Sequence, residues 1–197
     1  MPGEEDEEGY QFGFVIVTSR LWLRVPNAKD SAAMAVLAAS PIVADNLAAA
    51  PCPLAGETGE RFAVVDRHSR AIVGGASYGP MVDRRASLEV AAWIGEPFWG
   101  RGFATEATQA VIDRAFADQR IQVLWCSNRA SNQRARRVIE KCGFQFRETG
   151  MVRSPSLRGA MPVERFVLDR RNWRSLKAWG ADGPGEGQMH ASHDNAA

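Results

Sequence analysis

The chain has 197 residues, of which 45% are hydrophobic and 24% charged, and its formal net charge at pH 7 is +1. This length and composition fit one globular domain and argue against a disordered or fibrous chain. No apolar run approaches the roughly 18 residues that a membrane-spanning helix needs. The acidic N-terminus is unlike a signal or transit peptide, so we expect a cytoplasmic protein without a membrane partner.

The charge is distributed unevenly along the chain. Residues 1–9 carry five carboxylates and no basic residue, and residues 180–197 carry three carboxylates and again no basic residue. Removing these eight negative charges from the net +1 leaves +9 for the rest. We expect residues 1–10 and 180–197 to be disordered tails and residues 11–179 to form the domain. The basic surface suits a ligand with phosphates, a nucleic acid or plain solvation. A nucleic-acid partner ranks last among these, because the chain lacks a recognition motif and an aromatic stacking platform.

The cysteines indicate a reducing compartment. Cys52, Cys126 and Cys142 are odd in number and do not have the spacing of a metal site. We therefore expect reduced thiols packed as small apolar side chains, and no metal cofactor.

The N-terminal half reads as strands and helices joined by short turns. Asp30 or Ser31 is the expected N-cap of a helix that Ser40 and Pro41 interrupt. A hairpin follows around the turn 66–70. The predicted strands are 12–23 (in one or two segments), 62–65 and 71–76, and the predicted helices are 32–39 and 42–49.

The central stretch is the most informative. Residues 88–94 form a nearly continuous apolar run, which predicts a buried strand, and Gly95 to Pro97 end it. Gly100 and Gly102 then lead into a helical pattern over 104–116. Such a loop directs backbone N–H groups at one place on the positive end of a helix dipole, which suits an anion. The alternative is a tight turn that binds nothing.

Two other kinds of glycine loop are excluded by their chemistry. A nucleotide-triphosphate loop needs Lys and then Ser or Thr after its last glycine, and here Arg101 and Gly102 follow Gly100. A dinucleotide fingerprint needs a third glycine where this chain has Thr105.

The C-terminal half continues the mixed pattern. A buried strand is predicted over 121–126, and a helix begins at Ser131 or Asn132 and ends at Gly143. A last strand covers 163–168. Strands and helices in this order predict an α/β fold of the α+β kind, a mixed sheet with helices on its faces.

Three stretches resemble one family. Residues 99–104, WGRGFA, are similar to the [QR]-x-x-G-x-[GA] loop of the GNAT superfamily of N-acetyltransferases. Residues 18–24, TSRLWLR, resemble the T-x-R-L-x-L-R opening of its Rim-type branch, the ribosomal-protein N-terminal acetyltransferases. Residues 132–144 are similar to the branch's N-x-x-[SA]-x-x-x-x-E-K-x-G-F helix. The resemblance covers about residues 12–173.

The resemblance implies the acyl-CoA N-acyltransferase fold, with a central, mostly antiparallel sheet. It implies transfer of an acetyl group from acetyl-CoA to a primary amine, on a protein N-terminus or a small molecule. The oligomeric state stays open, with a homodimer as one possibility, since domains of this family often pair. The resemblance places the helices of residues 32–49 on the acceptor side. Two alternatives stay open: a member that binds acyl-CoA without turnover, and a nucleic-acid-binding domain.

The resemblance also implies roles for particular residues. Glu89, the one charge in the buried strand, is the candidate catalytic base, unless it faces solvent on an alternating strand. Asn132 contacts the pantetheine arm of CoA or orders the site, unless it is only a helix cap. The candidate cofactor-binding residues are Ala92, Trp93, Ile94, Trp99, Gly100, Arg101, Gly102, Phe103, Ala104, Thr105, Asn132 and Ala135.

The sequence departs from the family where a general acid is expected. Many members have a Tyr where this chain has Ile139, and the ribosomal enzymes often have a Ser where it has Ala135. Cys142, Ser131 or a water are the groups left to protonate the departing thiolate, which is itself a weak base with a pKa near ~8.5.

Overall fold

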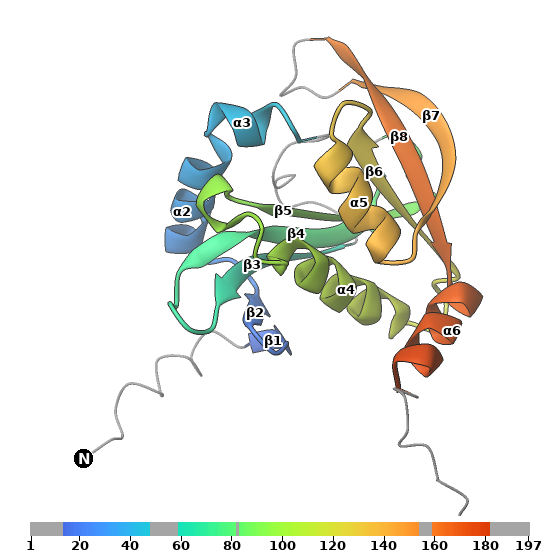
Figure 1. Cartoon of the computed structure of the whole chain (residues 1–197), viewed down its shortest axis with the longest axis horizontal. Helices are drawn as coiled ribbons and strands as arrows, with labels where there is room; N and C mark the ends of the chain where they lie inside the picture. Colours follow the sequence, from blue (N-terminus) through green and yellow to red (C-terminus); the bar gives the residue numbers. More distant parts are fainter. Residues whose placement is uncertain (1–13, 48–58, 82, 154–158, 182–197) are drawn as a thin grey trace, which may run out of the picture.

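A computed structural model describes residues 14–47, 59–81, 83–153 and 159–181. The expected tail 1–10, most of the tail 180–197, and Cys52 lie outside the described residues. The described residues form one eight-stranded sheet with helices on both faces (Figure 1). In chain order the elements are β1 (Phe14–Val17), β2 (Leu21–Arg24), α2 (Ala28–Ala38), α3 (Pro41–Ala44), β3 (Glu60–Asp66), β4 (Ile72–Pro80), β5 (Leu88–Ile94), the 3₁₀ turn η1 (Glu96–Phe98), α4 (Phe103–Phe116), β6 (Val123–Arg129), α5 (Gln133–Lys141), β7 (Gln145–Arg153), β8 (Ala160–Asp169) and α6 (Arg170–Ala181).

The sheet has the mixed, mostly antiparallel character that the sequence predicted. The strand order is β1-β2-β3-β4-β5-β6-β8-β7, and every neighbouring pair is antiparallel except β5 with β6. β7 and α6 have no counterpart in the sequence prediction. β7 pairs only with β8, at the edge of the sheet, and most of its side chains are exposed, so it carries no apolar run.

The parallel strands β5 and β6 are paired at one position and then separate. Their only register position joins Glu89 to Trp125, whereas β5 stays paired with β4 through to Ile94. Beyond Glu89, the edge of β5 that faces β6 is therefore unpaired within the sheet. An unpaired edge presents backbone N–H and C=O groups that need other partners.

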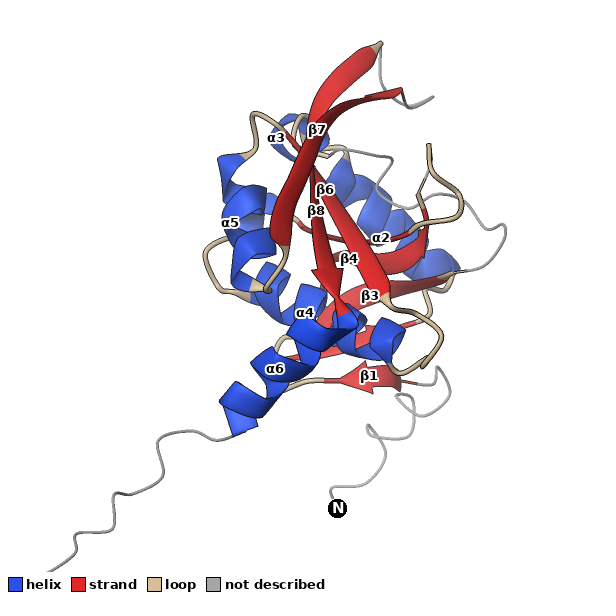
Figure 2. Cartoon of the chain, turned by 90° about the vertical axis from the view of Figure 1, so that its right-hand side faces the viewer, coloured by secondary structure: helices blue, strands red, loops and turns tan. Residues whose placement is uncertain are grey.

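Two hydrophobic cores hold the helices on opposite faces. α4 and α5 cover one face, where Phe116, Leu124 and Phe166 are almost fully buried. The smaller core under α2 and α3 joins Met34, Val43 and Trp93. Figure 2 shows α4 and α5 on one side of the sheet and α2 on the other. The sheet separates these two cores, and the gap between β5 and β6 is an opening in it.

The helix α2 begins earlier than predicted. Its N-cap is Asn27, whose side chain accepts a hydrogen bond from the Asp30 N–H at 2.9 Å, while the Asp30 carboxylate accepts from the Asn27 N–H at 2.9 Å. Asp30 is therefore the third helical residue of a capping box, not the cap itself. The next helix, α3, ends at Ala44, and residues 48–58 lie outside the described residues.

Asp30 also forms a buried ion pair with Arg24 on β2. We expect Asp30→Ala to lower the free energy of unfolding by about 3 kcal/mol, because it removes the carboxylate of the Arg24 ion pair and half of the capping box. Urea denaturation measures this loss. The neighbouring Lys29→Ala, an exposed change on the same helix, should stay within about 0.5 kcal/mol of the wild type. Equal effects of the two variants would contradict the assignment.

Candidate functional site

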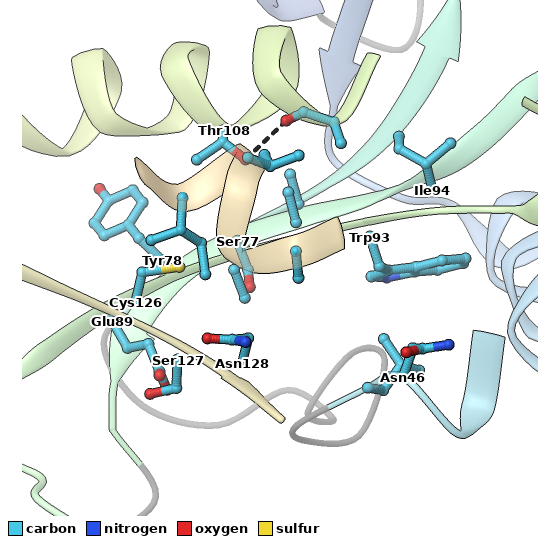
Figure 3. Close-up of a pocket in the computed structure, with 18 of the residues that line it drawn as sticks. Asn46, Ser77, Tyr78, Glu89, Trp93, Ile94, Thr108, Cys126, Ser127 and Asn128 are labelled. Atoms are coloured by element: carbon cyan, nitrogen blue, oxygen red, sulfur yellow. Dashed lines mark hydrogen bonds between the residues drawn. The ribbon is translucent and has the colours of Figure 1, made fainter. Parts of the chain in front are cut away.

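A cavity of about 700 Å³ occupies the gap between β5 and β6 and reaches both faces of the sheet. Figure 3 shows Glu89 and Ser127 at one end of it, Trp93 and Asn46 at the other, and Thr108 of α4 above. Every candidate site residue from the sequence lines this cavity except Arg101. The side chain of Arg101 is exposed, with its guanidinium 5.7 Å from the centre of the Phe98 ring, and it lines a separate small hollow.

The glycine loop prepares the N-terminus of α4. Gly100 and Gly102 have φ angles of 76° and 79°, a left-handed conformation that favours glycine. Gly102 is the N-cap and offers no side chain to the helix. The first helical hydrogen bond joins the Glu106 N–H to the Gly102 carbonyl at 3.1 Å. The N–H groups of residues 103–105 therefore have no carbonyl partner inside the helix, which is the arrangement that attracts an anion.

Trp99 fastens this loop to the end of β5. Its indole N–H donates to the Ile94 carbonyl at 2.6 Å, and the Arg134 guanidinium lies 5.2 Å from the centre of its ring. The family pattern has Gln or Arg here, so in this chain an aromatic anchor takes that position. Arg134 lines the cavity, whereas Arg136 turns to Glu140 and Glu164 and does not.

The open edge of β5 presents two backbone N–H groups to the gap. The Gly95 N–H donates to Val73 on β4 at 2.9 Å, and such bonds recur at every second residue of an antiparallel ladder. The N–H of Trp93 accordingly faces β4, and those of Ala92 and Ile94 face the gap. Trp93 instead contributes its ring to the cavity wall. Of the three residues predicted for this edge, Ala92 and Ile94 direct their N–H groups at the gap, and Trp93 does not.

Glu89 faces the cavity beside a mixed group of charges. Burial raises the pKa of its carboxyl group, and the negative charge of Asp83 adds to this effect. A hydrogen bond with Ser127 and the positive charge of Arg165 oppose it, but the net shift of the pKa is upward. Figure 3 shows the Glu89 and Ser127 side chains together. A carboxyl group with a raised pKa in a cavity is suited to proton transfer near neutral pH.

Asn132 uses both ends of its side-chain amide within the protein. Its oxygen caps α5 by accepting from the Ala135 N–H at 3.0 Å, and its nitrogen donates to the Asn46 carbonyl at 3.1 Å. It therefore caps α5 and ties that helix to the segment after α3. Its contact with pantetheine stays a prediction.

Neither of the two side chains predicted as a general acid, Cys142 and Ser131, lines the cavity. Cys142 is buried at the end of α5, where its thiol donates to the Thr105 carbonyl at 3.8 Å, and burial raises its pKa to about 12. Ser131 is exposed and does not line the cavity. Cys126 does line it, but burial raises its pKa well above the usual range for a thiol. Tyr78 donates to Glu60 at 2.9 Å, and burial together with that carboxylate raises its pKa to about 12.

The sequence analysis missed several cavity residues, and Asn128 and Arg165 stand out among them. The Asn128 amide nitrogen faces three acceptors, with the Arg129 and Asn132 carbonyls at 2.8 and 3.2 Å and Glu164 at 3.4 Å. Its amide oxygen is buried and has no hydrogen-bond partner among the described residues, and the same holds for Nε of Arg165. For Arg165 the signal in the sequence was a charged residue inside the predicted strand 163–168. Asn128 lies beyond the predicted strand 121–126, because β6 extends to Arg129. A buried group without a partner costs about 1–3 kcal/mol, so a ligand that supplies one is favoured.

Among the described residues no cluster of His, Cys, Asp and Glu could hold a metal ion, and no helix is long and apolar enough to cross a membrane.

Three comparisons bear on the family. An N-acetyltransferase from Bacillus licheniformis, uncharacterized p20, is 22% identical over 43% of this chain, and the match covers 48% of its own length. The structure of aminoglycoside acetyltransferase AAC(6')-Ib in complex with coenzyme A is 18% identical, with a TM-score of 0.64 over 80% of this chain and 99% of that one. A candidate ribosomal-protein-serine acetyltransferase from Vibrio cholerae is 17% identical, with a TM-score of 0.59 over 78% and 96% of the two chains.

At these identities the solved structures show a shared fold. The family assignment comes from the sequence model of the acetyltransferase (GNAT) domain, which matches residues 20–145, more than half of the chain. That range includes the glycine loop, the open edge of β5 and the cap of α5. The chain therefore belongs to the GNAT acetyltransferase family.

Proposed function

We propose that this protein transfers an acetyl group from acetyl-CoA directly to a primary amine. The observation that carries the proposal is the cavity in the β5–β6 gap, which has the N-terminus of α4 with its free N–H groups on one side and the Glu89 carboxyl group on the other. Acetyl-CoA supplies the activated acyl group. The residues around the gap would bind the cofactor, stabilise the charge on the thioester oxygen and take the proton from the amine.

The CoA side of the cavity is the face covered by α4 and α5. The N–H groups of residues 103–105 would hold the pyrophosphate, and Arg134 would add a positive charge beside Trp99. The N–H groups of Ala92 or Ile94 would donate to the thioester oxygen and stabilise the negative charge that develops on it. Pantetheine would fill the edge of β5 that β6 leaves open.

The acceptor side is the face covered by α2 and α3. Glu89, directly or through a water, would take the proton that the amine must lose as its nitrogen attacks the thioester carbonyl. The carbon–sulfur bond then breaks and CoA leaves as a thiolate. Since that thiolate is a weak base with a pKa near ~8.5, it can accept a proton from water without a dedicated acid.

A protein N-terminus is the acceptor that the Rim-type resemblance favours, and the likeness to the Vibrio cholerae structure is in keeping with it. Small-molecule amines are the other class. A member that binds acyl-CoA without turnover is the second candidate function, because neither residue 135 nor residue 139 has a hydroxyl group.

Calorimetric titration with acetyl-CoA and CoA tests the proposal first. We expect micromolar affinity for both, followed by release of free thiol from acetyl-CoA when a panel of peptides, amino acids and polyamines is added. Absence of binding would refute the cofactor assignment, and binding without thiol release for any amine would favour the non-catalytic role.

A further inference from the structure

We propose that Arg20, held in place by Glu106, is a further phosphate-binding residue of the cofactor site. The inference rests on the proposed function and adds to it a side chain from the β1–β2 turn, outside the glycine loop. It also assigns a role to two parts of the sequence that have no role in the site described above. These are residues 18–20, TSR, and Glu106 in the first turn of α4.

Glu106 collects hydrogen bonds from the whole β1–β2 turn. One carboxylate oxygen accepts from the Thr18 hydroxyl at 2.6 Å, from the Ser19 hydroxyl at 3.1 Å and from the Arg20 N–H at 2.9 Å. The other oxygen accepts from Nε of Arg20 at 2.7 Å. These contacts join residues 86 to 88 positions apart in the chain, so the turn and the start of α4 form one unit.

The guanidinium of Arg20 is directed along the glycine loop. Nη1 donates to the Arg101 carbonyl at 2.7 Å, and the group lies 5.2 Å from the centre of the Phe103 ring. Nη2 lies 3.2 Å from the position that a Cβ on Gly102 would occupy, and it has no hydrogen-bond partner among the described residues. A positively charged N–H donor is therefore fixed beside the N–H groups that open α4.

The arrangement resolves an electrostatic conflict. A carboxylate in the first turn stabilises a helix, but it also repels an anion bound at the same end. Burial by itself raises the pKa of Glu106, yet the hydrogen bonds from Thr18, Arg20 and Ser19 outweigh it and lower that pKa, so the group is ionised at neutral pH. Pairing with Arg20 cancels its charge toward the ligand. Nη2 then remains as a donor to a phosphate oxygen.

The glycine at position 102 fits this role. A side chain there would enter the space between the loop and Nη2 of Arg20. Arg20 lines the small hollow beside Arg101 rather than the cavity itself, and Phe103 borders both. Its side chain is half exposed, so its outer edge is accessible to a phosphate group that extends out of the cavity. Charge-assisted hydrogen bonds of arginine to phosphate oxygens are strong and directional.

The test compares two acyl donors on the full chain. Arg20→Met keeps the aliphatic stem over Phe103 but removes the charge and its donors. We expect it to weaken acetyl-CoA binding at least about tenfold, because one charge-assisted hydrogen bond is lost and the negative charge of Glu106 is no longer cancelled. Binding of S-acetylpantetheine, which has the thioester and both amides but no phosphate, should stay unchanged. Arg20→Lys should restore part of the affinity for acetyl-CoA. Arg70→Met removes a charge stacked on Trp22, away from α4, and should change neither affinity.

The outcomes distinguish a phosphate-binding role of Arg20 from a structural role. An equal loss for both donors would make Arg20 a structural residue, and an unchanged affinity for acetyl-CoA would remove it from the site; either result overturns the proposal. If the wild type binds no acetyl-CoA at all, the proposed function fails instead. Melting temperatures of the variants show whether the fold survives. Should Arg20→Met unfold, Arg20→Gln is measured in its place against the same two donors.

Discussion

Replacing Gly102 with glutamate is expected to weaken acetyl-CoA binding by at least about a hundredfold, while most of the fold survives. The new carboxylate would stand at the N-cap of α4, where it would repel a pyrophosphate and compete for its N–H donors. It would also reach Arg20, whose Nη2 lies 3.2 Å from the position of the added Cβ. Calorimetry with acetyl-CoA and CoA measures the loss.

Gly102→Ala is the matched control for this variant. It introduces the same left-handed strain, about 1–2 kcal/mol for a residue with a Cβ, but no charge. The two variants should therefore have similar melting temperatures and different affinities. Wild-type affinity in Gly102→Glu would show that the loop is a turn without a ligand.

The second large effect is expected from Glu89→Gln. This variant keeps the shape of the side chain but cannot accept the proton of the amine, so kcat should fall by about 10²- to 10⁴-fold. The affinity for acetyl-CoA should be unchanged, because Glu89 lines the cavity beside Ser127, on the side where we propose that the acceptor binds. Glu140→Gln, an exposed change on α5, is the control and should keep its kcat.

The pH dependence gives a second measure of Glu89. The base acts when ionised, so wild-type kcat/KM should rise with pH through the raised pKa of this group, and Glu89→Gln should lack this rise.

The contribution of Glu89 to the stability of the fold has the opposite pH dependence. A carboxyl group whose pKa is raised by folding stabilises the protein while protonated, and this contribution is lost as the pH rises through that pKa. Relative to the wild type, Glu89→Gln should thus gain stability with increasing pH. If Glu89→Gln has the same kcat as the wild type and the same rise of kcat/KM with pH, Glu89 is not the catalytic base.

The strongest local signals in the sequence were the most reliable. The apolar run 88–94 is β5 with the predicted bounds, and α4 begins only one residue before the predicted start. Gly143 is left-handed, as predicted for the end of α5, with φ of 93°. Each of these features depends on local periodicity or on the freedom of glycine, so it can be read without knowing the neighbours.

Features that depend on a partner strand were not predictable in this way. β7 lies at the edge of the sheet with an exposed face, and its sequence shows no alternation that would predict it. Asn132 matched a family position, but the carbonyl of Asn46 that engages its amide nitrogen lies 86 residues away. The buried amide oxygen of Asn128 gained its significance only from the gap beside it.

By itself, the sequence determined the family, the mixed sheet and the glycine loop, because short-range spacing encodes all three. The tertiary structure alone decided where β5 and β6 separate, which N–H groups face the gap, and that Arg20 meets Glu106 at the start of α4. These outcomes depend on register and on contacts between distant segments. Packing sets such contacts, and local propensity carries no information about them.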